Sequence, residues 1–147
     1  MIAFGCSMID PGLYALRARP GIERTLEPDS QVFAIQAAGS IFRSYNLILE
    51  KAVALPGLEA VVLVHQDAEI VDPSFCSKVR GALADPEVGV VGCVGAVGAR
   101  GTAWWEGDVS GGSAVCRYGE AGGGEIPAVA FGGEGTPLVA RTGVVDT

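Results

Sequence analysis

Three consecutive polar residues, His65, Gln66 and Asp67, follow an apolar run at residues 60–64. This pattern is typical of a buried strand that carries polar side chains to one end of a sheet. In open α/β sheets, ligands bind at the carboxyl ends of the strands. His65 is the only histidine of the chain. It precedes Asp67 by two residues, so we expect both side chains to point to the same side of an extended backbone.

A carboxylate at such a strand end can ligate a hard divalent cation, and that cation can bridge the phosphates of a nucleotide. Histidine is an acceptable second ligand for Mn²⁺-like metals. Asp67 and His65 are therefore candidate metal ligands. The alternative is a structural pair, in which both side chains only form hydrogen bonds with neighbouring loops. Three residues alone do not decide between these two interpretations.

A second candidate site is Trp104-Trp105-Glu106, which lies in glycine-rich sequence. Tryptophan faces can stack on sugar rings or on hydrophobic acceptors, and the adjacent carboxylate can orient hydroxyl groups. The alternative is that the two tryptophans anchor a loop to the hydrophobic core. Asn46, taken by itself, is an ordinary polar residue on a predicted helix.

The composition argues against several classes of function. The net charge is −7 and the pI is about 4.6, without a cluster of Lys or Arg, so the chain lacks the concentrated positive charge of nucleic-acid-binding proteins. The four cysteines include no C-x-x-C pair. This spacing argues against a structural zinc site and favours four small buried side chains. The P-loop, Rossmann and nucleophile-elbow motifs are absent from the sequence.

The residues around these sites predict strands that alternate with helices. The clearest helix runs from Ile41 to about Ala52, because Ser40 can cap its start and Pro56-Gly57 can end it. The other predicted elements are a short strand at 2–6, a helix at 10–20 that ends at Pro20-Gly21, a strand at 31–35, the strand at 60–64, a helix from Asp72-Pro73 to about residue 83, and a strand at 88–94.

Strands alternate with helices from about residue 31 to residue 95, which predicts βαβ units with right-handed crossovers. The expected fold is therefore α/β, with a mostly parallel central sheet in a three-layer α/β/α arrangement. A chain of 147 residues favours a single domain over 1–147, with an irregular glycine-rich region at about 98–147. The sequence has no recognisable signal peptide and no apolar run of roughly 18 residues, so we expect a cytoplasmic protein without a transmembrane segment.

Taken together, the segment from Ser40 to Gly95 resembles the glycosyltransferase-like proteins related to family 2 glycosyltransferases, which have the GT-A fold. Its most specific parts are Ser44-Tyr45-Asn46 and the run at 63–67 that ends in His-Gln-Asp. The resemblance implies a metal-dependent transferase of the hexosyltransferase type. Such a protein binds a nucleotide-diphosphate sugar together with a divalent metal, Mn²⁺ or Mg²⁺, and transfers the sugar to an acceptor, here unknown.

The resemblance also implies roles for individual residues. In such enzymes a D-x-D-like element at this strand end holds the metal and the diphosphate, and here His65 occupies its first position and Asp67 its last. Asp67 would be the metal ligand, with His65 near the ribose or phosphate. The loop after the first strand, Cys6-Ser7, would border the nucleotide base. Asn46 and Gln66 would lie near the donor, and Trp104, Trp105 and Glu106 would lie on the acceptor side.

Two features depart from the pattern of the family. The turn at 36–40 lacks the acidic residue that usually holds uridine, so the identity of the base is open. The acceptor-binding half, with the usual catalytic base, would continue beyond about residue 147. An inverting transfer needs a base that deprotonates the acceptor hydroxyl. The late candidates are Glu106, Asp108, Glu134 and Asp146, and none is singled out by its spacing.

Two other classes of function stay open. A non-catalytic nucleotide- or sugar-binding module, or a truncated glycosyltransferase fragment, would keep the donor site without the catalytic base. A plain α/β protein would use His65-Gln66-Asp67 as a structural element and act through a partner. A short α/β chain with an incomplete sheet can also form a homodimer that covers a sheet edge.

Overall fold

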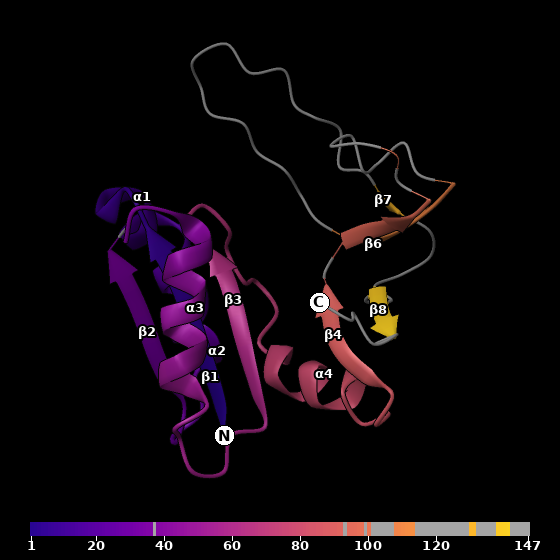
Figure 1. The fold of residues 1–147 in the computed structure, drawn as a ribbon, viewed down its shortest axis with the longest axis horizontal. Helices are drawn as coiled ribbons and strands as arrows, with labels where there is room; N and C mark the ends of the chain where they lie inside the picture. The colour runs from indigo at the N-terminus through magenta and orange to yellow at the C-terminus, as the bar shows by residue number, and fades with distance from the viewer. Residues whose placement is uncertain are drawn as a thin grey trace. The chain divides into compact units, whose positions relative to one another are not determined.

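The computed structural model describes residues 1–36, 38–92, 94–98, 100, 108–113, 130–131 and 138–141. The chain forms two compact units, Met1–Gly81 and Ala82–Thr147. The single domain expected over 1–147 stays a prediction. The first three strands and the first four helices lie in the first unit, apart from Ala82, the last residue of the fourth helix (Figure 1).

The first unit is built on a parallel sheet of three strands, β1 (Ile2–Met8), β2 (Gln31–Gln36) and β3 (Ala60–His65). The strand order is β2-β1-β3, so β1 lies in the middle. Cys6 of β1 is in register with Ala34 of β2 and with Val64 of β3. All three carboxyl ends therefore lie at the same edge of the sheet, as the alternation of strands and helices predicts.

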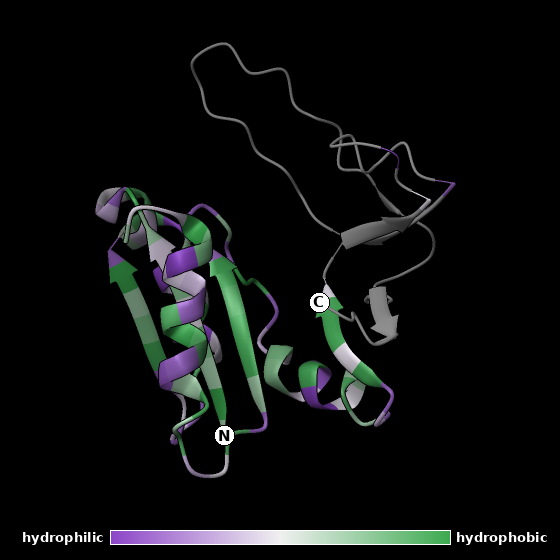
Figure 2. Cartoon of the chain, viewed as in Figure 1, coloured by the Kyte–Doolittle hydropathy of each residue, from purple (hydrophilic) through white to green (hydrophobic). Residues whose placement is uncertain are grey.

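The two faces of β1 pack against different helices. Ile2, Phe4 and Cys6 belong to a buried cluster that includes residues of α2 (Ala18–Thr25) and α4 (Phe75–Ala82). Gly5 lies on the opposite face, against Ile48 of α3 (Ile41–Ala52). The sheet is thus covered on both sides, which confirms the predicted three-layer α/β/α fold. In Figure 2, β2 and β3 are largely hydrophobic, although most residues of the edge strand β2 are exposed.

Helix α3 begins and ends where the sequence predicts. The Ser40 side chain accepts a hydrogen bond from the Arg43 amide at 3.2 Å, which satisfies one of the unpaired donors at the helix start. Ser44, Ile48 and Ala52 are buried and recur at a spacing of four residues, so they form the stripe that packs on the sheet.

The end predicted for the helix at 10–20 is wrong. Asp10 caps α1 (Pro11–Leu16), and a second helix, α2, then runs through Pro20 and Gly21 instead of stopping there. Pro20 is the third residue of α2. Its missing N–H falls in the first turn, where amides have no intrahelical partner, and the helix therefore tolerates it.

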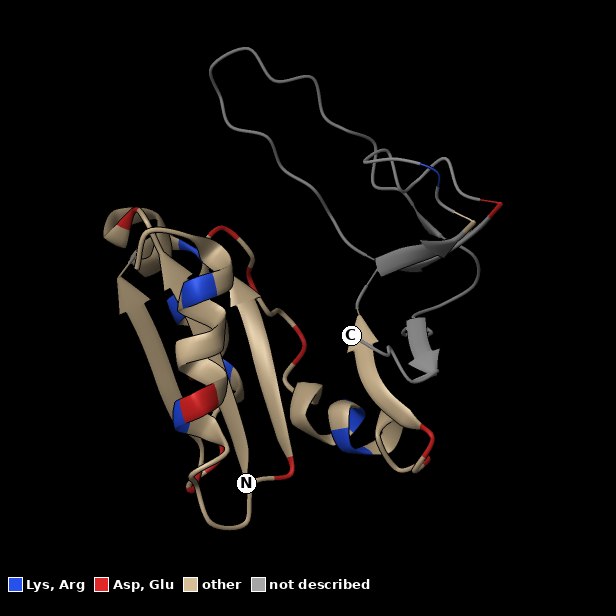
Figure 3. Ribbon diagram, viewed as in Figure 1, with Lys and Arg blue, Asp and Glu red and all other residues tan. Residues whose placement is uncertain are grey.

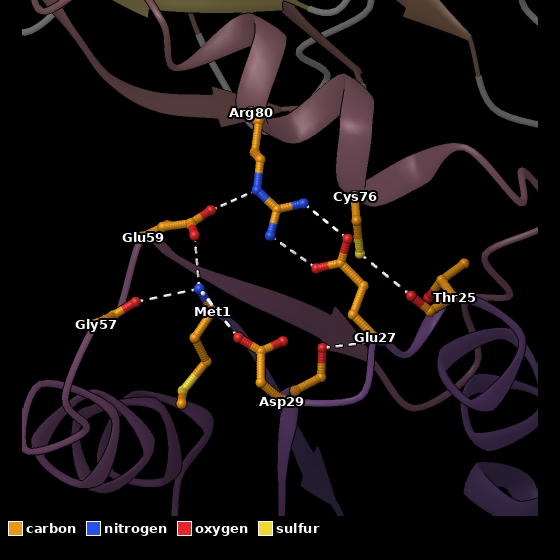
Figure 4. A network of polar contacts seen from close by, with 9 residues as sticks. Met1, Thr25, Glu27, Asp29, Gly57, Glu59, Cys76 and Arg80 are labelled. Carbon is orange, nitrogen blue, oxygen red and sulfur yellow. Dashed lines mark hydrogen bonds and ion pairs between the residues drawn. The ribbon is translucent and has the colours of Figure 1, made fainter.

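The amino-terminal edge of the sheet carries a network of ion pairs and hydrogen bonds, drawn in Figure 4. Two guanidinium nitrogens of Arg80, in α4, contact the two carboxylate oxygens of Glu27 at 2.8 and 2.7 Å. Arg80 also pairs with Glu59, and the Cys76 thiol donates to the Thr25 carbonyl at 3.2 Å. These contacts tie α4 to the segments that enter β2 and β3.

The second unit differs from the expected continuation of the parallel sheet. In the part of the chain that the structure describes, β4 (Val88–Gly92) pairs antiparallel with β8 (Leu138–Arg141). A second antiparallel sheet joins β5 (Val94–Val97), β6 (Val109–Ser113) and β7 (Ala130–Phe131). The strand predicted at 88–94 is therefore divided between two sheets, because its partners come from the glycine-rich region.

The described part of the chain contains no helix that combines the length and hydrophobicity required to cross a bilayer.

Candidate functional site

The carboxyl edge of the sheet gathers the polar residues that the sequence singles out. Ser7, near the end of β1, is in register with His65, the last residue of β3. With strand order β2-β1-β3, the connections of the chain reverse direction between β1 and β3, which is where doubly wound sheets bind their ligands. Figure 3 shows acidic residues along the segment that follows β3, and this segment contains Asp67, Glu69 and Asp72.

His65 and Asp67 form a hydrogen-bonded pair. The Nδ1 atom of His65 contacts the Oδ1 atom of Asp67, and the two side chains are 53% and 57% exposed. The two side chains meet as expected, but not on an extended backbone, because β3 ends at His65 and residues 66–67 form a turn. The contact uses one carboxylate oxygen of Asp67 and one ring nitrogen of His65.

Gln66 points to a different partner. Its side-chain oxygen accepts hydrogen bonds from the backbone amides of Ile9 at 2.8 Å and Asp10 at 3.0 Å. These two residues follow β1 directly, and Asp10 is the N-cap of α1. Gln66 therefore links the end of β3 to the loop between β1 and α1.

The segment after Asp67 is held against α2. One guanidinium nitrogen of Arg24 donates to the Ile70 carbonyl at 2.8 Å, and another pairs with Glu69 at 3.1 Å. Gly21 allows the close approach, since a Cβ atom at that position would lie 2.4 Å from the Ile70 amide nitrogen. The turn that carries Asp67 is thus fixed on both sides, by Gln66 and by α2.

A pocket of about 210 Å³ lies at the carboxyl ends of β1 and β2. Its lining combines two hydroxyl side chains, two apolar side chains and a glycine: Ser7, Ser40, Ile9, Ile41 and Gly39. None of these residues is ionisable, in keeping with the missing carboxylate in the turn after β2. The turn is held by the buried Ser44, whose hydroxyl group donates to the Ser40 carbonyl at 3.1 Å and accepts from the Ala38 amide at 3.4 Å.

Cys6 and Ser7 were expected in a loop beside the nucleotide base, but both lie within β1. Cys6 is fully buried in the core cluster. Burial, with a smaller contribution from the charge of Asp67, raises the pKa of the Cys6 thiol to about 11. Side chains alternate along a strand, so Ser7 faces the other way and lines the pocket. The structure thus places Ser7, and not the side chain of Cys6, at the pocket.

The other predicted site residues are spread more widely. Asn46 is exposed in α3, two residues from the buried Ser44 and from the buried Ile48, so it lies on the side of the helix away from the sheet. Asp108, in the second unit, is exposed and pairs with Arg100 at 3.4 Å. The roles assigned to Asn46 and Asp108 stay predictions. Trp104, Trp105, Glu106, Glu134 and Asp146 lie outside the described residues.

Sequence reasoning missed Ile9 and Ile41 as pocket residues. Both are apolar residues beside an element end, and both are exposed, Ile9 by 76% and Ile41 by 38%. Ile9 directly follows β1, and Ile41 is the first residue of α3. An apolar residue in such a position is a weak signal, because single exposed apolar residues are common on protein surfaces.

Comparisons with known proteins agree with the resemblance described above. The sequence profile of the glycosyltransferase-like family matches residues 14–123. The chain is also 31% identical over 105 residues to the streptomycin biosynthesis protein StrF of Streptomyces griseus; the match covers 71% of this chain and 37% of StrF. The chain therefore spans little more than a third of that relative's length. No solved structure matches this chain. From the family match and the relative together, the chain belongs to the glycosyltransferase-like family.

Proposed function

We propose that this chain binds a nucleotide-diphosphate sugar at the carboxyl edge of the sheet β2-β1-β3 and takes part in the transfer of the sugar, a hexose, to an acceptor. The observation that carries the proposal is the parallel order β2-β1-β3, which brings the Ser7 pocket and the exposed Asp67 to the same edge. Family membership supports the reaction class. The position of the edge agrees with the general location of ligand sites in α/β sheets.

The nucleoside of the donor would occupy the pocket beside Ser7, and its diphosphate would extend toward Asp67. The pocket offers hydroxyl groups and apolar contacts without a carboxylate. Recognition of the base would then depend on shape and on hydrogen bonds with neutral groups. This chemistry leaves uridine, guanosine and other nucleosides as candidates for the test below.

A divalent metal, Mn²⁺ or Mg²⁺, fits the donor set at Asp67. Among the described residues, no three side chains of His, Cys, Asp or Glu come together to hold an ion by themselves. Such metals are commonly held by one or two carboxylates plus the phosphates of the substrate, so the single exposed carboxylate is compatible with a metal–nucleotide complex. Asp67 and His65 would hold the ion, which would neutralise negative charge on the departing diphosphate.

The protein part of the mechanism is electrostatic. The chain has a net charge of −7, and Asp67 alone would repel a diphosphate. His65 orients the carboxylate through the Nδ1 contact, and Gln66 and Arg24 hold the turn that carries it. Because StrF is named as a protein of streptomycin biosynthesis, a small-molecule acceptor is the first class to test.

The test is thermal stabilisation of the chain by UDP, GDP and the corresponding nucleotide sugars, with Mn²⁺, with Mg²⁺ and with EDTA. A ligand at 100 times its Kd stabilises a native protein by about 2.7 kcal/mol. We expect a metal-dependent rise in Tm for wild type and its loss in Asp67→Asn. The matched control is Asp29→Asn, which changes a carboxylate that is 58% exposed near the amino-terminal edge and should keep the rise.

If no nucleotide raises the Tm of folded wild type with either metal, the proposed donor site is wrong. Binding without release of sugar or transfer to an acceptor would favour the non-catalytic module.

A further inference from the structure

Gln66 lies between the two candidate metal ligands in the chain, but its side-chain oxygen accepts hydrogen bonds from the loop between β1 and α1. We propose that Gln66 is a positioning residue of the donor site, which holds the pocket and Asp67 in one fixed arrangement without touching the donor through this oxygen. The proposal rests on the function proposed above and gives Gln66 a role different from a donor contact.

The pocket side of this link is direct. Ile9 lines the pocket, and its amide donates to the Gln66 oxygen at 2.8 Å. The Asp10 amide donates to the same oxygen at 3.0 Å, while the Asp10 carboxylate accepts from the amides of Gly12 and Leu13 at 2.9 and 3.1 Å. One side-chain oxygen therefore fixes both a wall of the pocket and the start of α1.

The other side of the link is the turn itself. The Ala68 amide donates to the His65 carbonyl at 3.0 Å and closes a tight turn around Gln66 and Asp67. Since Gln66 lies between His65 and Asp67 in the chain, a rotation of its backbone would also turn the Asp67 carboxylate. The hold of Gln66 on Ile9 and Asp10 therefore limits where Asp67 can point.

The exposure of the loop indicates that the link serves position more than folding. The Ile9 side chain is 76% exposed and Asp10 is exposed as well. Water can therefore replace the Gln66 oxygen at both amides if the side chain is changed. The fold should survive such a change, while the loop loses its fixed place at the edge of the pocket.

The chemistry of the link suggests two informative substitutions. Both hydrogen bonds use the acceptor oxygen of Gln66. In Q66E the carboxylate keeps an acceptor of the same size at the same place. In Q66M the length of the side chain is similar, but the acceptor is lost. Gln31→Met makes the same chemical change on an exposed residue at the start of β2, far along the strand from the carboxyl edge, and is the matched control.

The experiment combines amide hydrogen exchange by NMR with titration of the full chain. The probes are UDP and GDP, each with Mn²⁺, and the nucleosides uridine and guanosine. The nucleosides carry no charge, so their binding reports the position of the pocket residues without repulsion from the negative charge that Q66E adds. For Q66M we expect faster exchange at Ile9 and Asp10 and about tenfold weaker binding of the preferred nucleotide and nucleoside, the effect of losing hydrogen bonds of ordinary strength. Q66E should keep both amides protected and bind the nucleoside like wild type, and Q31M should change neither reading.

Three outcomes separate this inference from the proposed function. If wild type binds a nucleotide and Q66M binds it equally well, the site stands and the positioning role is wrong. If Q66E keeps the amides protected but loses nucleoside binding, Gln66 contacts the donor directly, which also overturns the inference. If wild type binds none of the probes, the proposed function fails, and the exchange rates of Ile9 and Asp10 alone show whether the link forms.

Discussion

Gly5 of β1 lies directly against Ile48 of α3: a Cβ atom on Gly5 would stand only 2.3 Å from the Cγ2 atom of Ile48. This contact sets how closely α3 approaches the middle strand of the sheet. Ser7 follows Gly5 on the same face of β1, and Ser40 and Ile41 form the start of α3. The close packing of one glycine and one isoleucine therefore brings together three residues that line the pocket.

Gly5→Ala should destabilise the protein by about 1–3 kcal/mol, because the added methyl group overpacks a buried contact. The clash involves the Ile48 side chain, so the added cost of Gly5→Ala should become smaller in an Ile48→Ala background. Urea unfolding of wild type, both single variants and the double variant measures this coupling.

The matched control is Gly81→Ala, because a Cβ atom on Gly81, in α4, would meet no atom within 4 Å. This variant should be neutral or more stable by up to about 1 kcal/mol, since alanine favours a helix. If Gly5→Ala lowers the free energy of unfolding equally in wild type and in the Ile48→Ala background, a clash with the Ile48 side chain is not the cause of its effect.

Gly21→Ala should be more damaging than Gly5→Ala. Its Cβ atom would lie 2.4 Å from the Ile70 amide nitrogen and 2.9 Å from the Ile70 carbonyl oxygen, and backbone atoms cannot move aside as a side chain can. We expect a loss of stability at or above the upper end of the range for overpacking, about 3 kcal/mol. Urea unfolding measures it, with Gly81→Ala again as the control.

The same substitution should also displace the segment that follows Asp67, because Arg24 and Gly21 hold that segment on α2. At a temperature where both variants are folded, Gly21→Ala should bind nucleotide more weakly than the control Gly81→Ala. Unchanged binding would mean that the approach of α2 does not position Asp67.

The pairing of Arg80 with Glu27 should make stability fall in acid. Hydrogen bonds from Arg80 lower the pKa of Glu27, and hydrogen bonds from the Met1 ammonium and from Arg80 lower the pKa of Glu59. A carboxyl group whose pKa is lowered in the folded state stabilises it above the ordinary glutamate pKa, about 4.3, and this contribution is lost as the pH falls through the lowered value.

Glu27→Gln should therefore be less stable than wild type at about pH 7, and the difference should shrink as the pH falls below about 4.3, the ordinary glutamate pKa, and through the lowered pKa of Glu27. Urea midpoints across this range measure the effect. Glu50→Gln, which changes an exposed glutamate on α3, is the matched control. A constant difference between wild type and Glu27→Gln would refute the assignment.

Sequence reasoning predicted the parts of the fold that depend on neighbours in the chain. The Ser40 cap, the apolar stripe of α3 and the apolar run before His65 are local patterns, and each forms the element that it predicts. The end of the helix at 10–20 was wrong because Pro20 falls in the first turn of a second helix. No local pattern shows that Gly21 must lie against the backbone of Ile70.

By itself the sequence determined that an apolar strand delivers His65, Gln66 and Asp67 to one end of a parallel sheet, because strand length, polarity and spacing are properties of short segments. Only the tertiary structure decided what these side chains meet there. It turned Gln66 toward Ile9 and Asp10, placed Ser7 rather than Cys6 at the pocket, and paired β4 with β8. Such contacts join residues far apart in the chain, and they depend on how closely backbones approach, which no run of neighbouring residues encodes.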